Sequence, residues 1–392
     1  MDVQGLASAN QRRTANMKIA FRVDASLQMG SGHVMRCLTL ADALKAQGAD
    51  CQFISREHSG HLLEVIRQRG YKVNSLVAHA QPAQAAIKSI VKEALSPKQE
   101  LAHAAWLGTT WQTDAQESAA ILADLQPDWL VVDHYALDQR WEEALTPHCR
   151  QLLVIDDLAD RPHHCDLLLD QNLGRKPEHY GPLVPEKCQV LTGPQYALLR
   201  PEFAALRPYS LQRRKVQPAL RQLLITMGGV DQPNATGQVL QALKTCTLPQ
   251  EFRITVVMGL IAPWLQNVRE LATQMPWPTE VVVNVNDMAL RMADSDLAIG
   301  AAGSTSWERC CLGLPTLMVV LAENQQAGAQ ALEAAHAARL IGSVSDVATQ
   351  LPHAVQELID STHPARMSLA ASAITNGQGV EKILKAMGLL NA

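Results

Sequence analysis

The chain has 392 residues, of which 47% are hydrophobic and 18% charged, and its net charge is -4. This length exceeds one ordinary core and predicts two domains of somewhat under about 200 residues each. The negative charge argues against a nucleic-acid binder with a broad basic surface, and no apolar run approaches the roughly 18 residues needed to span a bilayer. We therefore expect no nucleic-acid partner and no membrane partner. A small polar or anionic ligand remains compatible with this composition.

The cysteine pattern indicates a reducing compartment. The chain has eight cysteines, with no CxxC pair and no regular disulfide spacing. Several lie in apolar patterns, where cysteine behaves as a small hydrophobic residue, so we expect reduced thiols and a cytoplasmic location. Residues 1–16 are polar and lack the apolar region of a signal peptide, which predicts a disordered leader.

The first half of the chain alternates short apolar runs with helical patterns. This alternation predicts a parallel α/β domain, here a Rossmann-like domain over 17–210. Strands are expected at 18–23, 51–55, 129–132, 152–155 and 167–169, and helices at 34–47 and 62–68. A further helical pattern covers 81–105.

The first strand leads into a glycine turn and a helix. Its end, Arg22-Val23-Asp24, is followed by Gly30-Ser31-Gly32-His33. Such a turn before a helix is an anion site, and the same field disfavours an imidazolium, so His33 is expected to be neutral and able to act as a general base. The alternative is an imidazole that only caps the helix or contacts phosphate. Asp24 would orient His33 or bind sugar, or it would cap the glycine loop.

Polar residues follow three further strands of the first domain. They are Asp133-His134-Tyr135, Asp156-Asp157 and Asp170-Gln171-Asn172. Ligands of open α/β sheets bind beyond the carboxyl ends of the strands, so this edge is a candidate sugar site. We expect no metal there, because adjacent carboxylates point to opposite faces of a strand, and the histidines and cysteines lack tetrahedral-ligand spacing. His134 and His164 are interpreted as hydrogen-bonding residues, with a direct catalytic role as the alternative.

The alternation restarts after a basic, proline-bearing segment at 209–221, which we interpret as an exposed linker. Strands are expected at 223–226, 252–257, 281–285, 297–299 and 316–320. They predict a second Rossmann-like domain over 219–392. The fold class is thus α/β with two parallel sheets.

Two loops of the second domain are suited to a nucleotide diphosphate. The turn containing Gly228, Gly229 and Asp231 follows a strand, and its backbone amides can cradle phosphate. The alternative is a tight strand-to-helix turn, which also needs glycine.

The second loop runs through Gly303, Ser304 and Thr305 into a helix. Its hydroxyls can donate to phosphate, and Glu308 can accept hydrogen bonds from two ribose hydroxyls. The alternative is that Ser304 is an N-cap and Glu308 a capping-box acid. Asn324 and Gln325 follow the next strand and add polar amides at the same edge. Trp106 and Trp307 are interpreted as packing residues, with stacking on uracil or sugar as the alternative.

These motifs resemble a known group of enzymes. The glycine-histidine loop, the Gly-Gly-x-Asp loop and the Gly-Ser-Thr-Ser-x-Glu helix occur in the order found in UDP-sugar enzymes of the GT-B architecture, which include the lipid II glycosyltransferases. The runs Arg22-Val23-Asp24-Ala25-Ser26, Gly32-His33-Val34-Met35-Arg36-Cys37, Val132-Asp133-His134-Tyr135 and Ile155-Asp156-Asp157-Leu158 look closer to the UDP-2,4-diacetamido-2,4,6-trideoxy-beta-L-altropyranose hydrolases of pseudaminic acid biosynthesis. The similarity extends over nearly the whole chain from Lys18.

This resemblance implies a GT-B fold whose two domains face each other across a cleft. It implies metal-independent hydrolysis of a UDP-sugar at the anomeric carbon, with His33 as the base, no cofactor, and a monomer or weak oligomer. The expected substrate-binding residues are Asp24, Gly30, Gly32, Arg36, Asp133, His134, Tyr135, Asn172, Gly228, Gly229, Asp231, Gly303, Ser304, Thr305, Glu308, Asn324 and Gln325. Two other interpretations remain open, namely an inverting glycosyltransferase that uses the same cleft and a nucleotide-sugar binding protein without catalysis.

Overall fold

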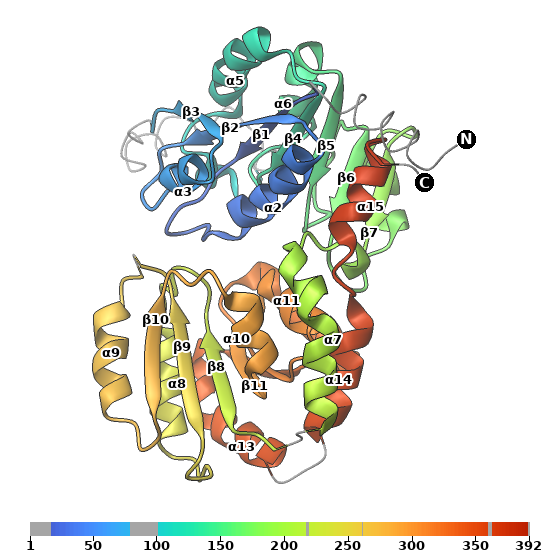
Figure 1. The fold of residues 1–392 in the computed structure, drawn as a ribbon. Coiled ribbons are helices and arrows are strands. Elements are labelled where there is room, and N and C mark those ends of the chain that lie inside the picture. The colour runs from blue at the N-terminus through green and yellow to red at the C-terminus, as the bar shows by residue number, and fades with distance from the viewer. Residues whose placement is uncertain (1–16, 79–100, 217–218, 261, 360–362, 391–392) are drawn as a thin grey trace.

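A computed structural model describes residues 17–78, 101–216, 219–260, 262–359 and 363–390 of the chain. Its described part contains two parallel sheets of seven and six strands, one above the other in Figure 1. The predicted leader at 1–16 and residues 81–100 of the predicted helical segment lie outside the described residues.

The first sheet has the order β3-β2-β1-β4-β5-β6-β7, and all of its pairs are parallel. Its strands are β1 (Lys18–Val23), β2 (Asp50–Arg56), β3 (Lys72–Leu76), β4 (Trp129–Asp133), β5 (Gln151–Ile155), β6 (Leu167–Asp170) and β7 (Gln189–Thr192). The five predicted strands are confirmed to within a residue or two, since most of their residues are buried, as expected for the inner strands of a parallel sheet. The edge strands β3 and β7 were not predicted.

Helices cover both faces of this sheet. They are α2 (Gly32–Ala46), α3 (Leu63–Gln68), α5 (Trp111–Leu125) and α6 (Gln139–Leu145), with short 3-10 helices η1 (Ala104–Leu107), η2 (Thr146–His148), η3 (Pro177–His179), η4 (Gly181–Leu183) and η5 (Pro194–Tyr196). The two predicted helices correspond to α2 and α3. Two apolar clusters, one on each side of the sheet, form the core of this domain.

The second sheet has the order β10-β9-β8-β11-β12-β13 and is also parallel. Its strands are β8 (Gln222–Thr226), β9 (Arg253–Met258), β10 (Thr279–Val283), β11 (Leu297–Ala301), β12 (Thr316–Val320) and β13 (Arg339–Ser343). The five predicted strands are present, and β13, at an edge, was not predicted. The accompanying helices are α8 (Ala235–Leu243), α9 (Leu265–Thr273), α10 (Met288–Asp294), α11 (Thr305–Cys311), α12 (Gln326–Ala334), α13 (Val347–Ile359) and α14 (His363–Ile374), with η6 (Glu323–Gln325) and η7 (Val344–Asp346).

The predicted linker is largely helical. Helix α7 (Pro201–Val216) contains most of the basic segment that suggested an exposed connection. Its arginines bind the second domain: Arg213 pairs with Asp296 at 2.6 Å, and Arg214 donates to the carbonyl of Met292. Basic composition therefore reflects contacts with a neighbouring domain here and not solvent exposure.

The chain finally returns to the first domain. Helix α15 (Gly379–Ala386), which the sequence placed in the second domain, lies beside the first sheet in Figure 1. Ile383 and Leu384 are buried in the first domain's core. The two domains are thus joined by α7 and by the segment that leads into α15.

Each sheet reverses its strand order at one point, and both reversals face the same cleft. In the first sheet the change lies between β1 and β4, and in the second between β8 and β11. Loops that leave neighbouring strands in opposite directions open a crevice there, where α/β proteins bind ligands. The glycine loop before α2 and the loops after β8 and β11 all lie at these two points.

Candidate active site

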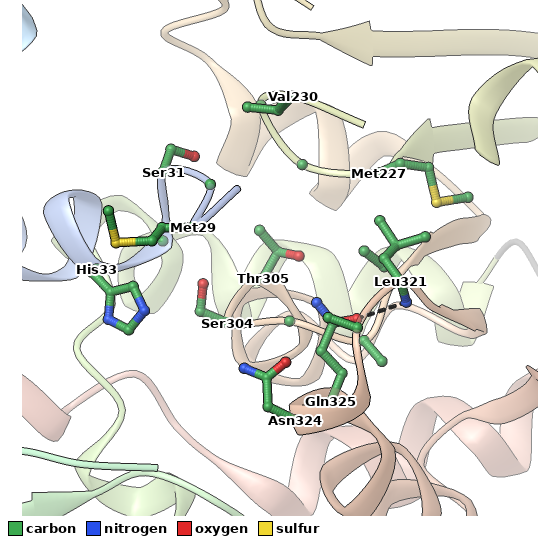
Figure 2. A pocket seen from close by; sticks show the side chains of 18 of the residues that line it. Met29, Ser31, His33, Met227, Val230, Ser304, Thr305, Leu321, Asn324 and Gln325 are labelled. Atoms are coloured by element: carbon green, nitrogen blue, oxygen red, sulfur yellow. Dashed lines mark hydrogen bonds between the residues drawn. The ribbon is translucent and has the colours of Figure 1, made fainter. Parts of the chain in front are cut away.

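A cavity of about 390 Å³ lies between the domains and is lined by residues from both. Figure 2 shows Met29, Ser31 and His33 from the first domain on one side, and Ser304, Thr305, Asn324 and Gln325 from the second on the other. The cavity brings together fourteen of the predicted residues. They are Gly30, Gly32, His33, Arg36, Tyr135, Asn172, Gly228, Gly229, Asp231, Gly303, Ser304, Thr305, Asn324 and Gln325.

The glycine loops of the two domains approach each other closely. Gly30 has a φ of +75°, which an L side chain rarely adopts, and its amide closes a turn onto the carbonyl of Ser26. A Cβ atom on Gly229 would lie 3.1 Å from Oγ of Ser31, and one on Gly32 would lie 3.4 Å from Oγ of Ser304. The missing side chains therefore let loops from different domains line one narrow space.

His33 is held by a buried carboxylate. Its Nδ1 lies 2.6 Å from Oδ1 of Asp133, which is fully buried at the end of β4. Arg36, one turn along α2, donates from Nε and Nη2 to the same carboxylate at 2.6 and 2.7 Å. Because a carboxylate only accepts, we assign the Nδ1 proton to the bond with Asp133, which leaves Nε2 as a proton acceptor.

The charges around this pair keep Asp133 ionised. Burial alone would raise its pKa, but Arg36 and His33 together hold the pKa of Asp133 far below its ordinary value. Arg36 also pairs with Asp157 at 2.8 Å, and the hydroxyl of Tyr135 donates to Asp157 at 2.7 Å. Arg36 and Tyr135 line the cavity with their polar ends already engaged.

Polar side chains of the second domain and of the sheet edge have structural partners as well. The carboxylate of Asp231 caps α8 by accepting from the amides of Ala235 and Thr236 at 2.8 and 2.9 Å. Gln325 accepts from the amide of Leu321, the dashed line in Figure 2, and Asn172 donates to the carbonyl of Asp157. These three residues line the cavity while their side chains hold neighbouring loops and helices in place.

Four predicted binding residues do not line the cavity, and three of them are internal. Asp24 is 1% exposed, pairs with Arg22 at 2.6 Å and accepts from the amide of Arg56. Asp24 therefore neither touches His33 nor caps the glycine loop. His134 is buried, and its Nδ1 accepts from the amide of Ala136. Asp133 is the third, and its carboxylate contacts His33 and Arg36 as described above, so it supports the site from behind.

Glu308 is the fourth residue outside the cavity. Its carboxylate lies 3.7 Å from Nη2 of Arg200, a residue just before α7, and its side chain is 17% exposed. Burial raises the pKa of Glu308 to about 7 against the opposing charge of Arg200. Its role as a ribose ligand stays a prediction. Ser304 precedes α11 without a side-chain capping bond, so the N-cap alternative for this hydroxyl is not realised.

The raised pKa of Glu308 predicts a pH-dependent stability. Between its ordinary pKa of about 4.5 and about 7 the folded carboxyl keeps its proton while the unfolded one loses it, so the stabilising contribution is lost as the pH rises through this range. The free energy of unfolding of the wild type should fall between pH 5 and pH 8. In Glu308→Gln we expect this fall to be smaller by about 1–2 kcal/mol. Urea unfolding at the two pH values measures it.

Exposed Glu270 provides the matched control, because Glu270→Gln should leave this pH dependence unchanged. Part of the slope should persist in Glu308→Gln, since burial also raises the pKa of Asp170 to about 7. Identical pH dependences for wild type and Glu308→Gln would show that the Glu308 carboxyl is ionised in the folded protein.

Some cavity residues were not singled out as ligands from the sequence. Trp106 lines the cavity and stacks on Tyr135 with ring centroids 5.7 Å apart, and Trp307 lines it too, so both combine packing with access to a ligand. Met29 and Ser31 also line the cavity, and so does Asp157, which lies at the predicted sugar-site edge but was not assigned as a ligand. Their one sequence signal is proximity to the glycine loop or to a strand end.

Two further structural features bear on the kind of site. No group of three or more histidine, cysteine, aspartate or glutamate side chains that could hold a metal ion occurs among the residues described. Within the same described ranges, no helix is long and apolar enough to cross a membrane.

Comparison with known proteins confirms the predicted resemblance. Residues 223–387 match the glycosyltransferase family 28 C-terminal domain. The chain is 26% identical over 313 residues to the UDP-2,4-diacetamido-2,4,6-trideoxy-beta-L-altropyranose hydrolase of Campylobacter jejuni, covering 80% of this chain and 95% of that protein. It is 25% identical over 313 residues to the uncharacterized protein MJ1062 of Methanocaldococcus jannaschii, covering 79% of this chain but 56% of the archaeal protein, so it spans little more than half of that relative's length.

The solved structures identify the architecture. The crystal structure of MurG from Acinetobacter baumannii superposes with a TM-score of 0.67 at 14% identity, covering 95% of this chain and all of that one (100%). The chain therefore has the GT-B fold, with two Rossmann-like domains facing each other across the cleft that contains the cavity.

Proposed function

We propose that this protein processes a UDP-linked sugar and that it hydrolyses a UDP-linked 2,4-diacetamido-2,4,6-trideoxy sugar, releasing UDP and the free sugar for pseudaminic acid biosynthesis. The observation that carries the proposal is the arrangement of His33. Its imidazole contacts Asp133 and lines a cavity whose opposite wall is made of the glycine- and hydroxyl-bearing loops of the second domain. The likeness to the Campylobacter hydrolase supports the choice of substrate class.

His33 acts as the general base in this reaction. Water in the cavity gives a proton to Nε2 while its oxygen attacks the anomeric carbon, and the bond between that carbon and the diphosphate oxygen breaks with inversion. Asp133 holds the Nδ1 proton and stabilises the imidazolium that forms. A positioned base of this kind contributes roughly 10²- to 10⁴-fold to the rate.

The second domain holds the leaving group. Backbone amides of Gly228 and Gly229, with the hydroxyls of Ser304 and Thr305, are the donors that we assign to the diphosphate. As the glycosidic bond breaks, its electron pair passes to the β-phosphate oxygen, which is a good leaving group without a proton from a strong acid. Neither a metal nor a cofactor takes part in the proposed reaction.

The cytoplasm is the proposed location. All eight cysteines are free thiols in the structure, including Cys165 and Cys188, whose sulfur atoms are 3.6 Å apart. Free thiols are typical of proteins in a reducing compartment.

An NMR assay with a panel of UDP-sugars tests the proposed function. We expect the protein to convert a UDP-linked 2,4-diacetamido-2,4,6-trideoxy sugar to UDP and free sugar in buffer alone, and to convert UDP-N-acetylglucosamine at least about 10²-fold more slowly. The GT-B fold keeps an inverting glycosyltransferase as the second candidate. UDP release that requires an added sugar acceptor would favour that candidate and contradict hydrolysis.

A further inference from the structure

Arg309 is a buried cation without a carboxylate partner. Its side chain, on α11, is 1% exposed. Within the described ranges, no acidic oxygen lies within 4.0 Å of its guanidinium, and its Nε has no hydrogen-bond partner. The adjacent Glu308 turns toward Arg200 instead. Burial lowers the pKa of Arg309 to about 10, which still leaves the side chain charged near neutral pH.

Among the residues that the structure describes, the four other buried arginines each have carboxylate partners. Arg22 contacts Asp24 and Asp114, and Arg36 contacts Asp133 and Asp157. The remaining two are Arg56, which contacts Asp114 and Glu117, and Arg161, which contacts Asp156 and Asp160. Arg214, which is partly buried, donates instead to carbonyls, those of Ser210, Ala293 and Met292. An unpaired buried charge costs several kcal/mol, and the folded protein carries this cost at Arg309. An anion that binds nearby would offset that cost.

The guanidinium of Arg309 lies directly behind a cavity loop. Its Nη2 donates to the carbonyl of Ala301 at 2.7 Å and to Oγ of Ser306 at 3.0 Å, and both of these residues line the cavity. A Cβ atom on Gly300 would collide with Nη1 of Arg309. Gly300, within β11, therefore leaves the space that the guanidinium of Arg309 occupies.

Arg309 also sets the direction of one hydroxyl group. Its Nη1 donates to Oγ1 of Thr305 at 3.2 Å, and because this bond uses a lone pair of that oxygen, the hydroxyl proton of Thr305 remains free to be donated. Thr305 lines the cavity, as Figure 2 shows, so an anionic oxygen in the cavity is a suitable acceptor.

We propose that Arg309 is a positioning residue for the nucleotide diphosphate, supplying positive charge from behind the loop and holding the Thr305 hydroxyl as a donor. This inference rests on the proposed function for the identity of the anion. When the glycosidic bond breaks, negative charge grows on the β-phosphate oxygen, and a cation in a low-dielectric setting stabilises it without touching it.

Binding of UDP and of uridine to Arg309→Met tests the proposal. Uridine is the charge-free probe, because it shares the base and ribose but has no phosphate. We expect the variant to bind UDP roughly 10- to 100-fold more weakly, about 1.4–2.8 kcal/mol, with uridine affinity within about twofold of wild type. Equal losses for both ligands would indicate a structural role and overturn the proposal, as would unchanged UDP affinity.

Two more variants keep the test decisive. Thr305→Val removes the hydroxyl at the cavity surface and leaves Arg309 in place. UDP affinity should therefore fall severalfold, with uridine binding unchanged. Unchanged UDP affinity in Thr305→Val would overturn the proposal even if Arg309→Met failed to fold. Arg207→Met is the matched control, since Arg207 also donates to carbonyls, those of Cys311, Ser372 and Thr375, but away from the cavity. It should preserve the ratio of UDP to uridine affinity.

Measurements of UDP affinity and of UDP-sugar hydrolysis separate the role of Arg309 from the catalytic activity. Selective loss of UDP affinity in Arg309→Met, together with no hydrolysis of any UDP-sugar by the wild type, would support the role of Arg309 and contradict hydrolysis. Wild-type protein that binds UDP no better than uridine would overturn both.

Discussion

Replacing His33 by alanine is expected to reduce UDP release roughly 10²- to 10⁴-fold while changing UDP affinity only a few-fold. The reason is that the base comes from the first domain, whereas most of the assigned diphosphate contacts come from the second. Steady-state UDP release and calorimetric titration with UDP measure the two quantities. His33→Gln should behave in the same way, because its amide can still donate to Asp133 but cannot act as a base.

His148 offers a matched control for this substitution. It is half-buried in η2, outside the cavity, so His148→Ala should leave both quantities unchanged. If His33→Ala lost UDP affinity and turnover in parallel, His33 would be a ligand of the nucleotide and not the base.

Asp133→Asn is expected to reduce turnover by a similar factor, roughly 10²- to 10⁴-fold, with UDP affinity again within a few-fold. With the amide oxygen in the place of Oδ2, where it accepts from Nε of Arg36, the amide nitrogen takes the place of Oδ1 and donates to Nδ1 of His33. Nη2 of Arg36 then loses its acceptor. The imidazole then carries its proton on Nε2, which can no longer accept one from water. Since this tautomer is fixed by a hydrogen bond, raising the pH should not restore the rate. The pH profile of UDP release provides the measurement.

Stability has to be followed in the same variant. Arg36 retains Asp157 as a partner, so we expect Asp133→Asn to lose about 1–3 kcal/mol of unfolding free energy and to remain folded. Asp157→Asn is the comparison, because it also removes a partner of Arg36 but does not contact His33, and its turnover should fall much less. A destabilised Asp133→Asn with normal turnover would mean that Asp133 only anchors α2 to the sheet.

The central strands were predictable because apolar residues follow one another along most of their length. Strands such as β4 and β11 are buried on both faces and consist almost wholly of apolar residues, and β1 is apolar apart from Lys18 and Arg22. The strands that were missed, β3, β7 and β13, all lie at sheet edges. An edge strand has one neighbour and partly exposed faces, so its residues mix polar and apolar types and resemble a loop in the sequence.

The glycine loops of the site were also predictable from the sequence, whereas the buried side chains that hold these loops and His33 in place were not. Glycines in the loops that follow strands, as at Gly30 and Gly228, signal positive φ angles that few other residues adopt. By contrast, Asp133 looks like a ligand in the sequence and supports His33 in the fold, because its burial depends on the packing of α2 against β4. The unpaired state of Arg309 likewise has no sequence signal, since it depends on where every acidic side chain of the domain points.

Hydrolysis in water enriched in ¹⁸O, followed by NMR and mass spectrometry of both products, tests the role of His33 at the anomeric carbon most directly. We expect one heavy oxygen in the released sugar, none in UDP, and a first-formed sugar of inverted anomeric configuration. Heavy oxygen in the UDP phosphate, or retention of configuration, would mean that water activated by His33 does not attack the anomeric carbon.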